Sequence, residues 1–268
     1  METPLLPLNS ALFPYLAAYR FIRIPASMGP VSWIDYPRIA VDMVFIFDGE
    51  IQLKIGENPP FRVQKAAFTG HSEEYYQILI PAGTDCLHLR FQPGKAHAFC
   101  AHPQYLSTNT SQALVDFMRP DAWALYQELG ELETDLEKIH CLETRLQQWH
   151  CQSAEHPAVD AAIAQILRHQ GNLPVEQLCQ FLGTNYKSLN RWFKNKVGLS
   201  PKRFMQVTRF KHLLERLEIQ QDIPVDWMQQ VADFGFHDQA HFIRDFKQFA
   251  GQSPAAFMAN RQLRTAPI

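Results

Sequence analysis

The spacing of hydrophobic residues changes near residue 105. Before that point, short runs rich in β-branched and aromatic residues are separated by Pro, Gly and Asp. The stretch "VDMVFIFDGEIQLKIG" (41–56) places two such runs around Asp48-Gly49, a dipeptide typical of hairpin turns. "YYQILIPAG" (75–83) and "CLHLRFQPG" (86–94) each end in a Pro/Gly turn. This pattern predicts short antiparallel strands in a small barrel or sandwich.

From about residue 111 the hydrophobic residues recur at intervals of three and four, which is typical of amphipathic helices. Gly130 is a candidate break between two helices in this stretch. The stripe could pack on the barrel or form a dimer seam, and both interpretations stay open. Its members are Leu125, Leu129, Leu132, Leu136, Ile139, Leu142, Leu146 and Trp149. "CQSAEHP" (151–157) is expected to be a linker, after which the pattern is helical to about residue 262.

An internal repeat stands out in this last part. "SLNRWFKNKVGLSPKRF" (188–204) aligns with "HFIRDFKQFAGQSPAAF" (241–257) at an offset of 53 residues. One supersecondary unit has therefore been used twice. The matching positions are Arg191 and Arg244, Phe193 and Phe246, Lys194 and Lys247, Gly198 and Gly251, Ser200-Pro201 and Ser253-Pro254, and Phe204 and Phe257.

Each copy of the repeat predicts a helix, a sharp stop and a second helix. Glycine is a natural helix end, and Ser-Pro is a natural helix start. At 100° per residue the aromatic residues of each first helix share one face, and polar residues occupy the other. Shorter helices are expected ahead of each copy, at about 174–182 and 224–234, with a linker helix at about 201–219. The pattern predicts two helix-turn-helix units, each with one helix whose outward side chains suit a DNA groove.

Charge is distributed unevenly along the chain. Residues 157–268 carry 14 Lys and Arg against 9 Asp and Glu, a net of +5, whereas residues 1–156 carry 11 against 18, a net of −7. No acidic residue occurs between Glu176 and Glu215. Such a basic stretch points to a polyanionic partner, with nucleic acid as the default. Its cations are Lys187, Arg191, Lys194, Lys196, Lys202, Arg203, Arg209 and Lys211.

The stretch "VADFGFHDQAHFIRDFKQFAGQSPAAF" (231–257) resembles the signature of the AraC/XylS family of bacterial transcription regulators. The resemblance covers about residues 158–262 and implies sequence-specific binding of double-stranded DNA. Ala240 stands where serine is common in the family, which leaves the second reading helix with fewer polar groups. We therefore predict that the first unit contributes more base specificity. The resemblance implies DNA contacts by Lys187, Asn190, Arg191, Lys194, Gln239, Ala240, His241, Arg244 and Lys247.

The first half of the chain resembles the cupin-like β-barrel sensor domains that precede this DNA-binding unit in many family members. The stretch "IPAGTDCLHLRFQPGKAHAF" (80–99) carries this resemblance. It implies a small-molecule effector in the barrel, although aromatic residues could equally fill its core. A third interpretation is a structural or dimerising domain. The candidate pocket residues are Trp33, Phe45, Phe47, Phe68, Tyr76 and Phe91.

Metal binding and catalysis receive little support. The H-x-H pair that begins a cupin metal site is absent, although histidines and acids are available. His237 and His241 stand four apart, a spacing that can bind zinc, but no hydrolase glutamate or third ligand accompanies them. The chain also lacks G-x-S-x-G, Walker and G-x-G-x-x-G motifs. We expect no enzyme, catalytic residue, metal or cofactor; the alternative is a metal-dependent cupin-type enzyme fused to a DNA-binding module, using His71, His88, His97, His102, Glu73 and Glu74.

These observations predict an α+β protein: an amino-terminal antiparallel cupin-like β-barrel with linking helices, then an all-α domain of two helix-turn-helix units joined by a linker helix. The expected parts are a barrel at 1–110, a helical segment at 111–150, a linker at 151–157 and a DNA-binding domain at 158–262. The start of the chain lacks a secretory pattern, and no apolar run spans a membrane, so we expect a cytoplasmic protein. Candidate partners are DNA, an effector, a second copy of the chain and, for an activator, RNA polymerase.

Overall fold

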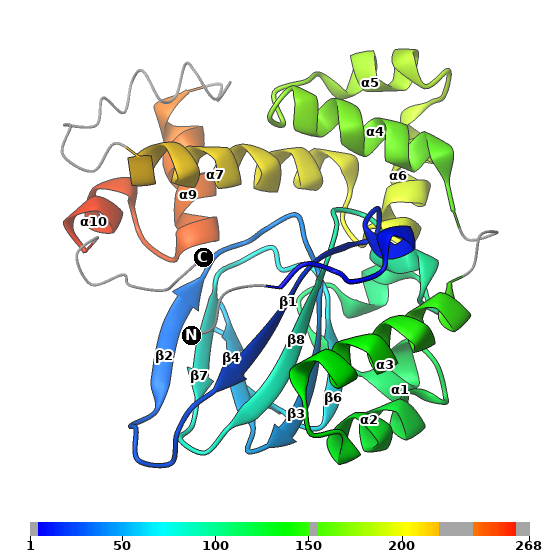
Figure 1. The fold of residues 1–268 in the computed structure, drawn as a ribbon. Coiled ribbons are helices and arrows are strands. Elements are labelled where there is room, and N and C mark those ends of the chain that lie inside the picture. Colours follow the sequence, from blue (N-terminus) through cyan, green and yellow to red (C-terminus); the bar gives the residue numbers. More distant parts are fainter. Residues whose placement is uncertain (1–4, 151–154, 220–237, 261–268) are drawn as a thin grey trace.

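Two antiparallel sheets form the amino-terminal part of the computed structural model, which describes residues 5–150, 155–219 and 238–260 (Figure 1). One sheet has five strands in the order β1-β8-β3-β6-β9, and the other has four in the order β2-β7-β4-β5. The five are β1 Leu16–Arg23, β8 Asp85–Phe91, β3 Asp42–Asp48, β6 Ala66–Thr69 and β9 Ser111–Ala113. The four are β2 Val31–Asp35, β7 Tyr76–Ile80, β4 Ile51–Ile55 and β5 Phe61–Val63.

The hairpin expected around Asp48-Gly49 is not formed. β3 pairs with β6 and β8 in the larger sheet, whereas β4 pairs with β5 and β7 in the smaller one. The dipeptide does turn the chain, because Gly49 has φ +79°, but the turn is a corner between the two sheets. A Cβ at Gly49 would lie 2.6 Å from Oγ1 of Thr84, so a side chain there has no room. Local turn chemistry predicted the bend and could not predict which strands pair.

Three helices cover the outer face of the larger sheet (Figure 1): α1 Leu114–Phe117, α2 Ala122–Glu131 and α3 Asp135–Trp149. Thr134 and Glu137 form a capping box that begins α3. Most of the leucine stripe packs on the sheet, since Leu125, Leu129, Ile139, Leu142, Leu146 and Trp149 are buried in one core with strand residues. Leu136, in contrast, is 62% exposed. The leucine stripe at 125–149 therefore packs mainly on the larger sheet and does not form an exposed dimer seam.

A second apolar core lies between the two sheets. Its buried members come from inward-facing positions of both sheets, as alternation along half-buried strands requires. Val44, Ile46 and Cys86 contribute from the larger sheet, and Leu53 and Ile80 from the smaller. The larger sheet is thus covered on both faces, by helices on one side and by the smaller sheet on the other.

The carboxyl-terminal part is helical and lies across one end of the sheets (Figure 1). One core unites these helices, centred on Phe193, Phe204, Phe210, Phe246 and Phe249. The predicted short helix at about 224–234 lies outside the described residues. The helices are α4 Pro157–Arg168, α5 Val175–Phe181, α6 Tyr186–Lys196, α7 Pro201–Ile219, α9 Gln239–Ala250 and α10 Pro254–Ala259. The prediction of an antiparallel sheet domain followed by a helical region is confirmed.

Several direct contacts join the helices to the sheets. The hydroxyl of Thr108 donates to the carbonyl of Gly198, 3.0 Å away. Nζ of Lys95 lies 2.8 Å from a carboxylate oxygen of Asp160 in α4. The ring of Tyr36 lies 6.2 Å from that of Phe210 in α7, between ring centroids. The two parts therefore pack directly against each other, in addition to being connected along the chain.

None of the helices within the described ranges is long and apolar enough to span a membrane.

Because of two buried histidines, we expect the free energy of unfolding to fall in mild acid. Nδ1 of His71 lies 3.0 Å from the carbonyl oxygen of Arg38, and Nδ1 of His97 lies 2.8 Å from that of Gly94. Burial lowers the pKa of each imidazole from 6.5 to about 4. Between pH 4 and pH 6.5 the unfolded chain therefore binds more protons than the folded protein. The free energy of unfolding has its full value above pH 6.5 and decreases as the pH falls toward 4. At pH 5 we expect a cost of about 2 kcal/mol for each histidine.

Urea unfolding at pH 7.5 and pH 5.0 measures this effect. The wild-type free energy of unfolding should fall between the two values, and His71→Asn and His97→Asn should each reduce that fall. Asparagine can still donate to the backbone carbonyl but does not titrate. A pH-dependent loss that is the same in the wild type and in both variants would contradict the assignment.

Candidate nucleic-acid interface

The first predicted reading helix is α6, and its local sequence explains its limits. Gly183, with φ +59°, lies in the turn after α5, and the side chain of Asn185 accepts a hydrogen bond from the backbone N–H of Ser188. Leu189 and Phe193 are fully buried on one face. The opposite face must then point away from the helical core, and the N-cap sets where that face begins.

The outward face of α6 is basic. Lys187 and Arg191 are exposed, whereas Asn190 and Lys194 are half-buried at its margins. None of the three cations makes an ion pair with a residue in the described ranges. Free guanidinium and ammonium groups beside an amide suit phosphate oxygens and base edges.

The second predicted reading helix, α9, is built in the same way. A carboxylate oxygen of Asp238 accepts from the backbone N–H of His241 at 2.7 Å and caps the start. Gly251, with φ +73°, ends the helix, and the hydroxyl of Ser253 caps α10. Phe242, Phe246 and Phe249 are buried in the helical core. The exposed residues of α9 include Gln239, Ala240, Arg244 and Lys247.

His241 faces an acid of its own helix. Its Nε2 lies 3.5 Å from a carboxylate oxygen of Asp245, which also accepts a hydrogen bond from the side-chain amide of Gln206 at 3.2 Å. Asp245 is 9% exposed and links α9 to α7. Asp245 is not among the predicted site residues, although its spacing of four from His241 signals the contact. His237, the other member of the suspected metal pair, lies outside the described residues.

The basic run of residues 187–211 separates into two groups. The side chains of Arg203 and Arg209 are largely buried, and this burial lowers the pKa of each. The guanidinium of Arg203 donates to the carbonyl of Glu73 at 2.6 Å and lies 4.4 Å from the ring centre of Phe249. Lys211 pairs with Glu215 on the next turn of α7. The outward cations of α6 are therefore a better guide to a polyanion than the whole basic run.

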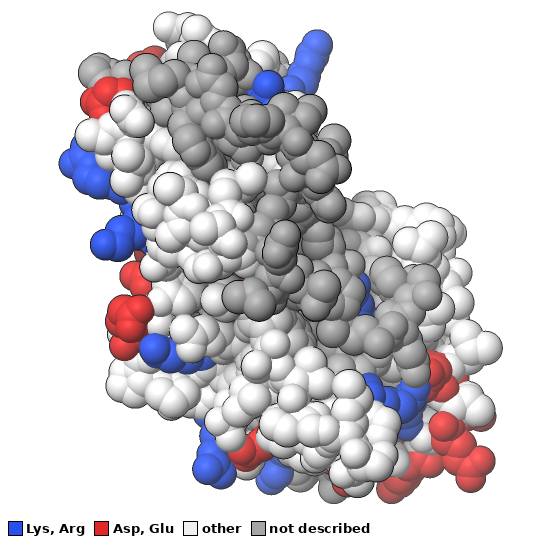
Figure 2. Space-filling model, turned by 90° about the vertical axis from the view of Figure 1, so that its left-hand side faces the viewer, with Lys and Arg blue, Asp and Glu red and all other residues white. Residues whose placement is uncertain are grey.

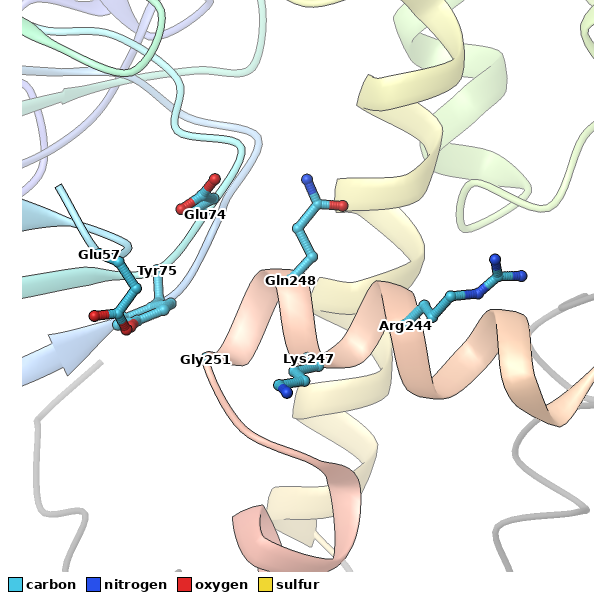
Figure 3. A pocket seen from close by; sticks show the side chains of 7 residues that line it. All are labelled: Glu57, Glu74, Tyr75, Arg244, Lys247, Gln248 and Gly251. Carbon is cyan, nitrogen blue, oxygen red and sulfur yellow. The ribbon is translucent and has the colours of Figure 1, made fainter.

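A pocket of about 380 Å³ lies where α9 meets the smaller sheet (Figure 3). Glu57, Glu74 and Tyr75 approach from the sheet side, and Lys247 and Arg244 from the helix. The side chain of Arg244 points away from the acids in Figure 3. Gly251 forms part of the wall, and a Cβ there would lie 2.5 Å from the Tyr75 ring. The carboxyl end of α9 is thus held against the amino-terminal part, while Arg244 stays open to solvent.

The six aromatic residues expected to line an effector pocket do not lie together. Phe45, Phe68 and Phe91 are buried between the larger sheet and helices α1–α3, and Phe47 packs against that same core. Trp33 packs between the two sheets. The hydroxyl of Tyr76 donates to the carbonyl of Gly70. Alternation along the strands divides these residues between two faces.

The histidines and acids considered for a metal site are also dispersed. His88 lies 3.3 Å from Asp42, His71 and His97 bond to backbone carbonyls, and His102 lies beside the ring of Phe117. Glu73 pairs with Arg203. In the described part of the chain, no three His, Cys, Asp or Glu side chains are grouped to hold a metal ion.

Charged residues lie mainly toward the edges of the face in Figure 2, which is the side that carries α10 and β2 in Figure 1. Its described central surface is mostly uncharged. Over its described surface, this face shows no continuous basic patch of the kind that binds nucleic acid.

A family model described as a helix-turn-helix domain matches residues 178–260, which include α6, α7 and α9. A search of the curated proteins found no significant match. Among solved structures, the chain is similar to ToxT from Vibrio cholerae, with 11% identity, 90% of this chain and 97% of that chain covered, and a TM-score of 0.46. It is also similar to the AraC-like transcriptional activator CuxR, with 13% identity, coverage of 74% and 76%, and a TM-score of 0.29.

Proposed function

We propose that the protein regulates transcription by reading double-stranded DNA with α6 and α9, because a helix-turn-helix family model matches residues 178–260 and residues 231–257 resemble the AraC/XylS signature. The observation that carries the proposal is the duplicated unit, in which each reading helix buries an aromatic face and exposes cations that have no ion-pair partner among the described residues. In this arrangement, Arg191 and Arg244 reach base edges, and the lysines position the protein on phosphates.

The proposed contacts are those expected from the family resemblance. They comprise Lys187, Asn190, Arg191 and Lys194 on α6, with Gln239, Ala240, Arg244 and Lys247 on α9. His241 is a weaker candidate, because its ring already faces Asp245. A phosphate contact by His241 would have to compete with that carboxylate.

Selection of bound sequences from random duplex DNA, with the purified full-length protein, tests the proposal. We expect an enriched site with two half-elements about one helical turn apart, since each reading helix enters one major-groove segment. A double variant, Arg191→Ala with Arg244→Ala, should lose the enrichment but remain folded, because both side chains are exposed. Recovery of random sequences by the wild type would overturn the proposal.

Salt should weaken DNA binding steeply. Five cations on the two reading helices, Lys187, Arg191, Lys194, Arg244 and Lys247, lack ion-pair partners in the described ranges and can neutralise phosphates. If all five do so, the logarithm of affinity falls with the logarithm of salt with a slope of about −4.5, so a doubling of salt weakens binding about 20-fold. Fluorescence anisotropy with labelled duplex from 0.1 to 0.2 M salt measures the slope. A slope near zero would contradict phosphate contacts by these residues.

We further propose that the sheet domain, with bounds near 1–110, binds a small-molecule effector and acts on the DNA-binding domain at 158–262. The contacts of Thr108 with Gly198 and of Glu73 with Arg203 give such an effect a physical route. In this proposal the protein is a cytoplasmic regulator and catalyses no reaction. Formation of a homodimer and, for an activator, contact with RNA polymerase belong to the same proposal.

A further inference from the structure

A charged cluster occupies the space between the two sheets at the end nearest the DNA-binding helices. Asp42, only 6% exposed, lies at its centre. Nη2 of Arg38 lies 2.5 Å from Asp42, Nε of Arg90 lies 3.0 Å away, and Nε2 of His88 lies 3.3 Å away. The other guanidinium nitrogen of Arg38 lies 2.6 Å from Asp35 on β2. The two carboxylates of the cluster are therefore already engaged.

A third arginine in the cluster has no such partner. Arg20 on β1 stands opposite His88 on β8, in the row next to that of Arg90. Its neighbours Tyr19 and Phe21 face helices α1–α3, so alternation turns Arg20 toward the smaller sheet. Among the described residues, nothing accepts a hydrogen bond from its side chain or forms an ion pair with it. Burial, with the positive charges of Arg90 and Arg38, lowers the pKa of Arg20.

Among the residues that the structure describes, the cluster is one anion short. Arg20, Arg38 and Arg90 carry three positive charges, and Asp35 and Asp42 carry two negative ones. Three guanidinium groups gathered between two sheets repel one another, and an anion would offset that repulsion. A planar carboxylate fits best, because one guanidinium can donate to both of its oxygens.

The neighbouring surface is apolar and the cluster is open to solvent. In the smaller sheet, Asp35 on β2 stands opposite Tyr76 on β7. Two residues along β2, on the same face, Trp33 stands opposite Ile78. Trp33 and Ile78 are partly buried against the core between the sheets. The side chains of Arg38 and Arg90 are 26% and 29% exposed, so small solutes can reach them. The surroundings favour a ligand with one anionic end and a small apolar body.

We propose that this cluster binds a small organic acid, with its carboxylate on Arg20 and Arg90 and its apolar part against Trp33 and Ile78. Asp42 is a positioning residue that holds Arg38, Arg90 and His88 in place around the ligand. The proposal names the ligand class of the effector step proposed above, and it rests on that step only for its effect on DNA binding.

The cluster is directly connected to the helical core. Asp35 and Asp42 bracket a short segment whose Tyr36 and Ile39 pack into the core of the DNA-binding helices. The Tyr36 ring lies 5.6 Å from that of Phe257 in α10, between ring centroids. Arg38 lies in the same segment and pairs with both acids. A ligand on Arg20 and Arg90 can therefore act, through Asp42 and Arg38, on the segment whose Tyr36 contacts α7 and α10.

Isothermal titration of the full-length protein with benzoate and with hexanoate tests the site. We expect saturable binding of at least one of these carboxylates and much weaker binding of benzamide and hexanamide, which keep the shape without the charge. Arg20→Gln should weaken carboxylate binding about 10- to 100-fold, as expected for loss of a charged hydrogen-bonding partner. Arg20→Lys should retain part of the affinity. Arg62→Gln is the matched control, because Arg62 is an exposed arginine of the same domain, 68% exposed.

Three results would overturn the site: no saturable binding of either acid, equal binding of acid and amide, or unchanged binding in Arg20→Gln. DNA affinity measured with and without the bound acid tests the coupling, which fails if that affinity is unchanged. Arg20→Gln should bind DNA like the wild type when no acid is present. If the protein binds carboxylates but selects no specific DNA, the proposed function is wrong and the carboxylate site stands. If it selects specific DNA but binds no carboxylate, the carboxylate site is wrong and the proposed function stands.

Discussion

Replacement of Arg191 by alanine is expected to weaken binding to the selected DNA site about 10- to 100-fold, the cost of losing one two-pronged contact with a base edge. Arg191 lies at the centre of the outward face of α6, is exposed and has no ion-pair partner in the described ranges. Its removal should therefore take away the proposed DNA contact without disturbing the fold. Fluorescence anisotropy with the selected duplex and with a scrambled duplex separates loss of specificity from general weakening.

Arg244→Ala should cost less than Arg191→Ala. Both arginines are exposed, but α9 presents Ala240 where α6 presents a polar or charged residue. Nε of Arg244 also donates to the carbonyl of Ala240, 3.3 Å away, on its own helix. Arg168→Ala is the matched control, since Arg168 is an exposed arginine at the end of α4 and belongs to neither reading helix. A larger loss of specific binding in Arg244→Ala would reverse the ranking of the two units.

Replacement of Asp42 by asparagine is expected to lower the free energy of unfolding by about 3–5 kcal/mol, the usual cost of removing one member of a buried ion pair. Asp42 is 6% exposed, and its carboxylate is surrounded by Arg38, Arg90 and His88. The positive charges of Arg38 and Arg90, together with the hydrogen bond from His88, hold the pKa of Asp42 well below its usual value against the opposing effect of burial. The neutral amide would leave the arginines without their counter-ion.

Urea unfolding at pH 7.5 measures this loss, with Asp48→Asn as the control. Asp48 lies on the same strand and is exposed, so its replacement should change stability by less than about 0.5 kcal/mol. Similar losses in the two variants would show that the cluster around Asp42 does not stabilise the fold.

The helical part could be predicted well because its signals are local. Glycine at 198 and 251, Ser-Pro after each, and aromatic residues at helical spacing specify where the helices end and which face is buried. The matching family model confirms the helix-turn-helix region. The fate of each cation was not predictable in this way. Arg203 and Lys194 look alike in the sequence, yet Arg203 is drawn onto Glu73, 130 positions away in the chain.

The amino-terminal part shows the limit of local signals more clearly. Strand periodicity predicted short strands and a turn at Asp48-Gly49, but it could not show that β3 and β4 enter different sheets. The choice of partner strands then placed Phe45, Phe68 and Phe91 under the helices and Trp33 between the sheets. Six aromatic residues that looked like one pocket therefore belong to different layers.

The sequence by itself determined the duplicated helix-turn-helix unit, the outward basic faces of its reading helices and the change from strands to helices near residue 105. Capping, helical periodicity and charge depend on residues within a few positions of one another, so they can be read along the chain. The tertiary structure alone decided that Arg20, Arg38 and Arg90 meet Asp35 and Asp42 between two sheets. That meeting depends on strand pairing and sheet packing across as many as 70 positions of sequence, from Arg20 to Arg90, which no local pattern records.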